Sequence, residues 1–348
     1  MEEIKFSDFK IIPDYNSIHR ETIDDDTYFS DKYKKFISNI RLKWIDPTDG
    51  GSPQLFQNPP NLQTSSLSLG SAIHECILQG DEFELAPKVN KPTAKLGMVM
   101  DNIQLLLKSN NDINEVIKNA ALKVDYFTKN IDSKIKTIKE TWEEYSSKIS
   151  KLQSQSTKKL IFLSDSDYDV ANACIQSLKS NQTISNILQP IDIFGENCEF
   201  FNEDALFIDF IVTYKEKQCA IIPFKLKIDN WTINNDTMTI SLNDLKTTGK
   251  TINQFMENSF EHYRYYRQLG VYMSILELYV NKEYGISPKT GWTFESNICA
   301  VETIPNYWSR CFKINDEDLH RGINEFTELL KRVAYYEIAG YDSEVSFI

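Results

Sequence analysis

The sequence predicts an α/β fold, in which a sheet is flanked by helices and a helical insertion interrupts the chain. Three observations support this class. Short runs rich in β-branched and aromatic residues, separated by polar turns, indicate strands after residue 198. Segments with the apolar period of helices precede and follow these runs. The order of helices, sheet, helix, strands and helix is that of an α/β core.

The first sixty or so residues are mixed, and helices are expected between them and the strands. Residues 46–61 carry enough Gly, Pro, Asn and Asp to form a loop. A helix is predicted from about 68 to 80, since its apolar residues recur with 3-and-4 spacing. Residues 95–160 almost lack Pro and Gly, which indicates an insertion of two or three surface helices. A further helix begins near Asp165, whose carboxylate suits a first turn.

The second half alternates between strands and helices. Strand-like runs are predicted at 205–214, 219–229, 237–246, 296–303 and 310–314. The Asn-Asn-Asp stretch at 234–236 is a hairpin signal between the second and third of these. Helical period returns over 252–280, and an amphipathic helix over 316–340 closes the sequence. We expect residues 1–60 to pack as an N-terminal segment on a main domain of residues 61–348.

Composition limits the class of protein. With 41% hydrophobic and 25% charged residues among 348, the chain is an ordinary globular protein. No stretch approaches the ~18 consecutive apolar residues of a membrane span, and the first residues do not form a signal peptide. The six cysteines form no CxxC pair, which argues against zinc ribbons and iron–sulfur clusters. A cytoplasmic protein with reduced thiols is therefore expected.

The formal net charge of −12 opposes binding to nucleic acid unless a local basic surface exists. The stretch with Lys129, Lys134, Lys136 and Lys139 is a candidate for such a surface. A solvated helix face is the more ordinary interpretation of these lysines.

Two predicted strands end in residues suited to metal chemistry. Asp229 ends the first run, and Asp244 and Lys246 end the next. If the hairpin brings the two carboxylates together, they repel each other unless a cation lies between them, which suggests Mg²⁺ or Mn²⁺. Because side chains alternate in a strand, Lys246 returns to the face of Asp244, where it could orient a water nucleophile and stabilise charge on a phosphate. An isolated Asp-x-Lys is more often a routine surface pair.

Further polar residues lie in apolar contexts. His74 interrupts an otherwise apolar helical stretch; a satisfied core histidine is the common case, but imidazole is also a borderline metal ligand. Tyr265, Gln268 and Tyr272 fall at i, i+3 and i+7 and share one helix face. Simple amphipathic packing and a role in holding the catalytic strand or a phosphate remain equal alternatives for these three.

The combination of GSAIHECIL, KLKID, a strand ending in NDLKTT, and YxxQxxxY resembles the PD-(D/E)XK nuclease superfamily. Within it, the sequence is similar to the RecE (exonuclease VIII) type of phage exonuclease, a relative of the RecB and Cas4 nuclease domains. The resemblance runs over most of the chain and implies a restriction-endonuclease-like core with a central mixed sheet. The cysteines that ligate the Cas4-type cluster are missing.

The resemblance implies roles for particular residues. Asp229 and Asp244 would bind the metal, Leu245 would lend its backbone carbonyl, and Lys246 would be the catalytic lysine. His74 would be an additional metal ligand. Gln268 and Tyr272 would match a QxxxY motif near the DNA, and Tyr265 shares their face. Glu203 is a weaker candidate for an acid before the first core strand, because Glu196 and Glu199 lie close by.

The function implied is a Mg²⁺- or Mn²⁺-dependent deoxyribonuclease, an exonuclease that works from DNA ends in phage recombination or DNA processing. DNA is the expected partner, and the resemblance also allows a single-strand annealing protein and further copies of the chain. The alternative is a catalytically inactive protein of the same fold that binds DNA or assembles with proteins, since a fold does not fix an activity.

Overall fold

The structure, a computed structural model, describes residues 8–60, 65–89, 92, 94–107, 112–126, 129–189 and 195–341. Two compact units are present, one formed by residues 1–78 and 170–348 and the other by residues 79–169. None of the helices in the described ranges is long and apolar enough to cross a membrane.

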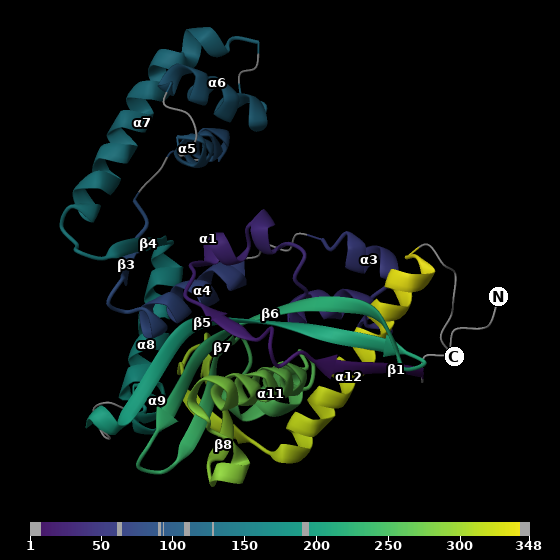
Figure 1. Cartoon of the computed structure of the whole chain (residues 1–348). Helices are drawn as coiled ribbons and strands as arrows, with labels where there is room; N and C mark the ends of the chain where they lie inside the picture. Colours follow the sequence, from purple (N-terminus) through teal and green to yellow (C-terminus); the bar gives the residue numbers. More distant parts are fainter. Residues whose placement is uncertain are drawn as a thin grey trace. The chain divides into compact units, whose positions relative to one another are not determined.

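The first unit is built on a seven-stranded sheet (Figure 1). Its strands are β1 (Phe9–Pro13), β2 (His19–Glu21), β5 (Cys198–Tyr214), β6 (Lys217–Asn234), β7 (Thr239–Thr248), β8 (Thr293–Glu302) and β9 (Ser309–Ile314). The order is β1-β5-β6-β7-β8-β9, and β2 also pairs with β5. Among these strands only β7 and β8 pair in parallel, and a helix connects them. Short connections join the antiparallel pairs β5–β6, β6–β7 and β8–β9, whereas β1 and β2 pair antiparallel with the distant β5. The predicted mixed α/β core is therefore confirmed.

Helices surround this sheet. They are α1 (Asp25–Tyr28), α2 (Asn39–Leu42), α3 (Pro53–Gln57), α4 (Ser65–Leu78), α8 (Asp165–Ser180), α9 (Gln182–Leu188), α11 (Tyr265–Tyr284) and α12 (Asp316–Ala339), with α8 beginning in the second unit. The long helices α11 and α12 lie along one face of the sheet (Figure 1). Their apolar residues join those of β5 to β8 in one core that includes Trp231, Leu242 and Leu330.

Two glycines allow α11 and α12 to cross closely. A Cβ atom on Gly270 would lie 2.3 Å from the carbonyl oxygen of Leu319, and one on Gly322 would lie 2.2 Å from that of Tyr266. Real atoms do not approach so closely, so any larger residue would push the helices apart. The position of α11 over the sheet therefore depends on both glycines.

Among the residues described, three helices lie wholly within the second unit. These are α5 (Ala94–Leu106), α6 (Ile113–Lys123) and α7 (Ile131–Gln153), and a two-stranded parallel sheet of β3 (Phe83–Pro87) and β4 (Lys159–Leu163) brackets them in the sequence. The helices share a small core of their own, in which Val99, Ile117 and Trp142 are buried. On α7 the charged residues that predicted a solvated helix lie mostly on the exposed face.

The segment before α11 differs from the continuous helix that its apolar period predicts. A 3₁₀ turn (Ile252–Gln254) and one turn of π-helix (Met256–Phe260) come first, and α11 begins only at Tyr265. The break lies at Arg264, whose φ of 53° is in the left-handed region. Side-chain period alone does not report such a backbone turn, because the apolar residues on both sides still face the core.

Candidate active site

The candidate site forms where β6 and β7 separate. Their pairing runs from Asn234–Thr239 to Asn230–Asn243 and then stops. One residue further on, a carboxylate oxygen of Asp229 accepts a hydrogen bond from the backbone N–H of Leu245 at 2.8 Å. The side chain thus replaces the strand as acceptor, which holds Asp229 in a fixed orientation at the fork.

Three acidic residues follow one another across neighbouring strands. Continued one residue beyond its last pair, the β6–β7 register reaches Asp229 and Asp244. On the other side of β6, Glu203 and Asp229 fall between the pairs Asn202–Asn230 and Asp204–Ile228. Glu203 interrupts its own strand pairing because its φ is 55°, a conformation that costs a non-glycine residue roughly 1–3 kcal/mol. The left-handed conformation turns the carboxylate of Glu203 toward the fork. The surrounding structure must compensate the free-energy cost of this conformation.

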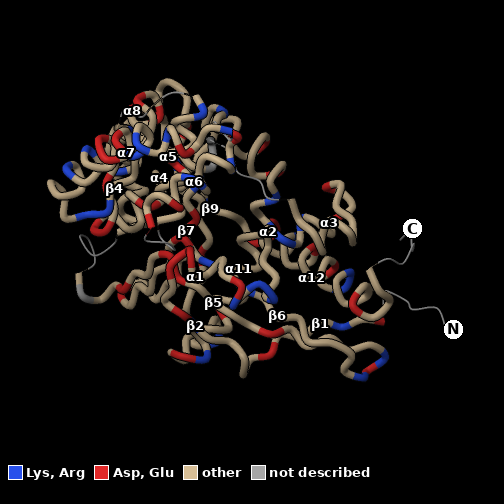
Figure 2. Tube along the Cα trace, turned by 90° about the horizontal axis from the view of Figure 1, so that it is seen from above, with Lys and Arg blue, Asp and Glu red and all other residues tan. Residues whose placement is uncertain are grey.

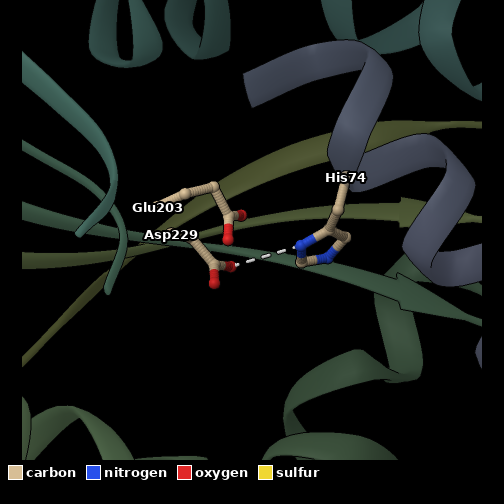
Figure 3. A group of neighbouring side chains, drawn as sticks. All are labelled: His74, Glu203 and Asp229. Atoms are coloured by element: carbon tan, nitrogen blue, oxygen red, sulfur yellow. Dashed lines mark ion pairs between the residues drawn. The ribbon is translucent and has the colours of Figure 1, made fainter. Parts of the chain in front are cut away.

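Helix α4 adds a histidine to this row (Figure 3). The Nδ1 atom of His74 lies 3.6 Å from a carboxylate oxygen of Asp229. Within the part of the chain that the structure describes, potential ligand atoms of His74, Glu203 and Asp229 all lie within 4.8 Å of one another. Gly70, one turn earlier, lets α4 approach β7, since a Cβ there would lie 3.1 Å from the Thr247 hydroxyl.

The protonation of these groups favours a bound cation. Burial, reinforced by the nearby Lys246, lowers the pKa of His74 to about 4, so its imidazole is neutral at pH 7. Burial and then repulsion from Asp229 raise the pKa of Glu203 to about 7. Burial also raises the pKa of Asp229 and brings that of Asp244 to about 6. Converging acids with raised pKa values and a neutral imidazole are ligands that a divalent cation would stabilise in their unprotonated forms.

A lysine lies beside this cluster. The ammonium of Lys246 is 2.6 Å from one oxygen of Asp244 and 5.1 Å from the centre of the Tyr265 ring. Burial opposes its charge, but Asp244 and Asp229 outweigh that effect and raise the pKa of Lys246. The other Asp244 oxygen accepts a hydrogen bond of 3.0 Å from the side chain of Gln268. Lys246 is therefore charged and held in place.

A second lysine was not anticipated from the sequence. The ammonium of Lys227, two residues before Asp229, lies 2.6 Å from a carboxylate oxygen of Glu203 and also contacts Asp25. Asp25 belongs to α1, around which acidic positions gather (Figure 2). The sequence KLKID held a signal for this lysine, because side chains alternate between the two faces of a strand and Lys227 therefore shares a face with Asp229.

A row of asparagines, three of them buried, lies one residue away from Asp229 and Asp244 along the strands and supports the fork. Asn297 donates to Asn243, Asn243 to Asn230 and Asn230 to Asn202, over 2.9, 2.7 and 2.6 Å. Asn202 then donates to the backbone carbonyl of Leu78 at the end of α4, 2.7 Å away. A carbonyl can only accept, so this last bond fixes the direction of the whole asparagine ladder. The ladder links four strands to the helix that carries His74.

The structure brings the residues singled out in the sequence together. Asp229, Asp244, Lys246 and His74 lie at the fork, and Gln268 and Tyr265 on α11 contact Asp244 and Lys246 respectively. Glu203 joins His74 and Asp229, whereas both oxygens of Asp244 are engaged by Lys246 and Gln268. Leu245 is fully buried. The metal-binding role of Asp244 and the carbonyl role of Leu245 stay predictions.

Two other residues complete the comparison with the sequence. Tyr272 is buried on α11 and interacts with Gln268, so its side chain supports the residue that contacts Asp244. Its expected role near DNA, like those of Gln268 and Tyr265, stays a prediction. Glu199, a rival of Glu203 in the sequence, is exposed at the start of β5.

Comparisons with known proteins bear on the family. None of the curated proteins matches the chain. A solved structure described as a "putative exonuclease" from Eubacterium rectale is 10% identical, with a TM-score of 0.45, and the match covers 93% of this chain and 89% of that one. The model of a family described as "PDDEXK-like domain of unknown function (DUF3799)" matches residues 57–337. This match confirms the superfamily expected from the sequence and supports a nuclease. The chain therefore belongs to the family of PDDEXK-like domains of unknown function (DUF3799).

Proposed function

We propose that the protein is a divalent-metal-dependent deoxyribonuclease. The observation that carries this proposal is the convergence of His74, Glu203 and Asp229 within 4.8 Å, beside the charged Lys246. Lone clusters of acids are common, but a neutral imidazole, two desolvated acids and a fixed lysine at a strand fork form a set with complementary chemistry. The match to a family of PDDEXK-like domains also supports a nuclease.

The donor set fits a hard divalent cation. Carboxylate oxygens of Glu203 and Asp229 suit Mg²⁺ or Mn²⁺, and the imidazole of His74 makes Mn²⁺ the better fit of the two. Asp244 and the carbonyl of Leu245 are the further ligands that the family resemblance implies. A bound cation would supply Lewis-acid stabilisation of a phosphate and a more acidic water.

The remaining residues act on the substrate and on one another. Lys246 would orient the attacking water and stabilise negative charge that develops on the phosphate. Asp244 keeps the ammonium of Lys246 in place, and Gln268 in turn orients Asp244. Tyr272 supports Gln268 from within the core. Lys227 holds the strained Glu203 toward the fork.

The finer part of the proposal is a RecE-like exonuclease that degrades DNA from its ends in phage recombination or DNA processing. We take residues 61–348 as the nuclease domain, with a helical insertion at about 95–160, and residues 1–60 as a segment that packs on it. The support is the resemblance of NDLKTT, GSAIHECIL and YxxQxxxY to that branch.

End-labelled linear DNA and covalently closed circles of the same sequence, incubated with Mg²⁺ or Mn²⁺, test this proposal. An exonuclease consumes the linear DNA and leaves the circles intact. Circles cut as fast as linear DNA would show an endonuclease instead. The affinity for linear DNA should also fall steeply with salt, because each phosphate contact releases about one counterion.

The net charge of −12 favours a second candidate, a non-enzymatic protein of the same fold that assembles with other proteins. This candidate predicts no cleavage in either metal and an almost flat response to salt. The cleavage assay and the salt dependence of DNA affinity together separate the two candidates.

A further inference from the structure

Two neighbouring tyrosines, an exposed Tyr263 and a half-buried Tyr265, lie between solvent and the candidate catalytic lysine. The side chain of Tyr263 is 57% exposed, although large aromatic residues are usually more buried. Its ring centre lies 5.6 Å from that of Tyr265 and 4.7 Å from that of the exposed His262. Tyr265 in turn contacts the ammonium of Lys246 at 5.1 Å. Tyr263 is therefore two ring contacts away from the lysine.

The inner end of this path is firmly packed. The ring of Tyr265 stacks on that of Phe255 at 6.0 Å, and Phe255 stacks on Phe312 at 5.4 Å, both with an interplanar angle of 18°. Phe255 is fully buried in the core. Tyr265 consequently has a fixed inner neighbour, and Tyr263, beside the exposed His262, presents its ring to solvent at the outer end.

The backbone that carries the pair is strained and anchored. Arg264, between the two tyrosines, has φ and ψ of 53° and 45°, which costs roughly 1–3 kcal/mol. Its guanidinium bonds to Asp49 at 3.1 Å, to both oxygens of Glu325 at 3.1 Å and to Thr48 at 2.7 Å. These bonds hold a turn that leaves Tyr263 outside while Tyr265 points inward. Such strain, held by several partners, is typical of functional sites.

The charges near Tyr263 and Tyr265 are compatible with the phosphate backbone of a DNA strand. Glu261, two residues before Tyr263, is engaged by the guanidinium of Arg321 through bonds of 3.1 and 2.8 Å. The charge of this acid is thus offset. On the inner side, the ammonium of Lys246, which is paired with Asp244, lies close to Tyr265.

We propose that Tyr263 is a stacking subsite for an unpaired nucleobase of a DNA strand whose phosphate lies at the Lys246 fork. This inference rests on the proposed function and adds to it a preference for a single-stranded or frayed segment at the site. A base has a flat π-face whatever its identity, so stacking on an exposed tyrosine is tolerant of sequence. The subsite would hold one base out of the duplex stack while the next phosphate reaches the fork.

The test uses a single-stranded oligonucleotide in which 2-aminopurine replaces one base at successive positions. Binding to the wild-type protein in EDTA, where metal-dependent cleavage is absent, should quench the fluorescence most at one position. We expect Tyr263→Ala to lose that quenching and to bind roughly 10-fold more weakly, which is the size of one base–aromatic stack. Tyr263→Phe should keep both properties. Trp308→Ala is the matched control, since Trp308 is also 57% exposed.

An abasic residue at the quenched position separates stacking from a general loss of fit. The abasic residue should lower the affinity of the oligonucleotide for the wild-type protein and for Tyr263→Phe. It should lower the affinity for Tyr263→Ala little further, because the abasic residue and the alanine substitution remove the same contact. In Mn²⁺, Tyr263→Ala should raise KM for a frayed linear duplex and change kcat by less than about twofold.

Equal quenching and affinity in Tyr263→Ala and the wild-type protein would overturn this inference while leaving the nuclease proposal intact. An equal loss in Trp308→Ala would overturn it too, since exposure alone would then explain the effect. If wild-type protein neither binds the oligonucleotide nor cleaves DNA in Mn²⁺, both proposals fail together.

Discussion

Two clusters of charged side chains in the first unit differ in how far the charges of their acids are neutralised by partners within the protein. One is the candidate site at the β6–β7 fork. The other, here termed the arginine cluster, consists of Arg264, Arg267, Asp46, Asp49 and Glu325. In it Arg267 is 3% exposed and bonds to Asp46 at 2.9 Å and to Asn39 at 3.3 Å. Planar arginines and carboxylates pair well in such geometry.

The pKa shifts of the two clusters are opposite. Burial opposes the charge of Asp46, but hydrogen bonds from Thr48 and the two arginines outweigh it and lower its pKa. At the fork, burial and mutual repulsion raise the pKa values of Glu203 and Asp244 to about 7 and about 6. In the arginine cluster the arginines neutralise the acids. At the fork the acids keep raised pKa values, so a bound cation would still stabilise their charged forms. A buried acid cluster therefore indicates function only when internal partners leave its charge uncompensated.

Arg267→Met should produce the largest loss of stability. Removing Arg267 leaves Asp46 with Thr48 and with the more distant guanidinium of Arg264, 3.9 Å away, and breaking a buried ion pair in this way costs up to about 3–5 kcal/mol in the free energy of unfolding. Chemical denaturation measures this change. Arg321→Met, at a more exposed ion pair, should cost less than about 1 kcal/mol. If the two variants unfold alike, the arginine cluster is not the structural element described here.

Lys246→Ala should differ in its main effect, which is a loss of turnover. Loss of one group that stabilises developing charge typically lowers kcat by about 10²–10³. Mn²⁺ affinity should persist, because Lys246 is not a ligand. Single-turnover cleavage and calorimetric titration provide the two readouts, with Lys313→Ala on β9 as the exposed control. Parallel loss of turnover and metal affinity would contradict this division of roles.

Asn243→Leu should lower both the stability of the protein and its affinity for metal, because it breaks the asparagine ladder beside the fork. It deprives Asn230 and Asn297 of their partner, which costs roughly 1–3 kcal/mol when such groups are buried. Because Asn230 and Asn243 adjoin Asp229 and Asp244, metal affinity should also fall by about 10-fold or more. Thermal melts with and without Mn²⁺ measure both effects. A loss of stability with unchanged metal affinity would limit the ladder to a structural role.

The effect of pH gives a smaller but more specific prediction. Since the folded pKa of Glu203, about 7, is raised, its contribution to stability is present at low pH and is lost as pH rises toward 7 without metal. His74, with its lowered pKa of about 4, acts in the opposite sense between pH 4 and 6.5. A cation reverses the cost of ionising Glu203, so the rise in Tm on adding Mg²⁺ should be larger at pH 8 than at pH 6. Glu203→Gln should flatten this dependence.

The strands and their order of appearance were predictable from sequence because alternation and β-branched residues are local signals. The predicted runs at 205–214 and 219–229 lie within β5 and β6, and the run at 237–246 overlaps β7 from Thr239 onward. The hairpin between the last two is present, with its turn at 235–238. The short strands β1 and β2 gave no comparable signal, because their pairing with β5 decides their conformation.

The site was only partly predictable. Asp229, Asp244, Lys246 and His74 could be selected by residue type and spacing. Glu203 could not be separated from its neighbours, because its place in the site depends on a left-handed backbone conformation that no sequence period encodes. The Lys227–Asp25 contact and the asparagine ladder depend on pairing between distant segments, which spacing along the chain does not report.

The most direct test of the central claim is a calorimetric titration of Mn²⁺ into wild-type protein and into Glu203→Gln. If Glu203, Asp229 and His74 form the metal site, the wild-type protein binds Mn²⁺ saturably and Glu203→Gln binds it at least about 10-fold more weakly. His74→Ala should weaken binding as well and be partly rescued by excess Mn²⁺, while Glu199→Gln should match the wild type. Equal Mn²⁺ affinity in Glu203→Gln and the wild-type protein, or no saturable binding in either, would contradict the account.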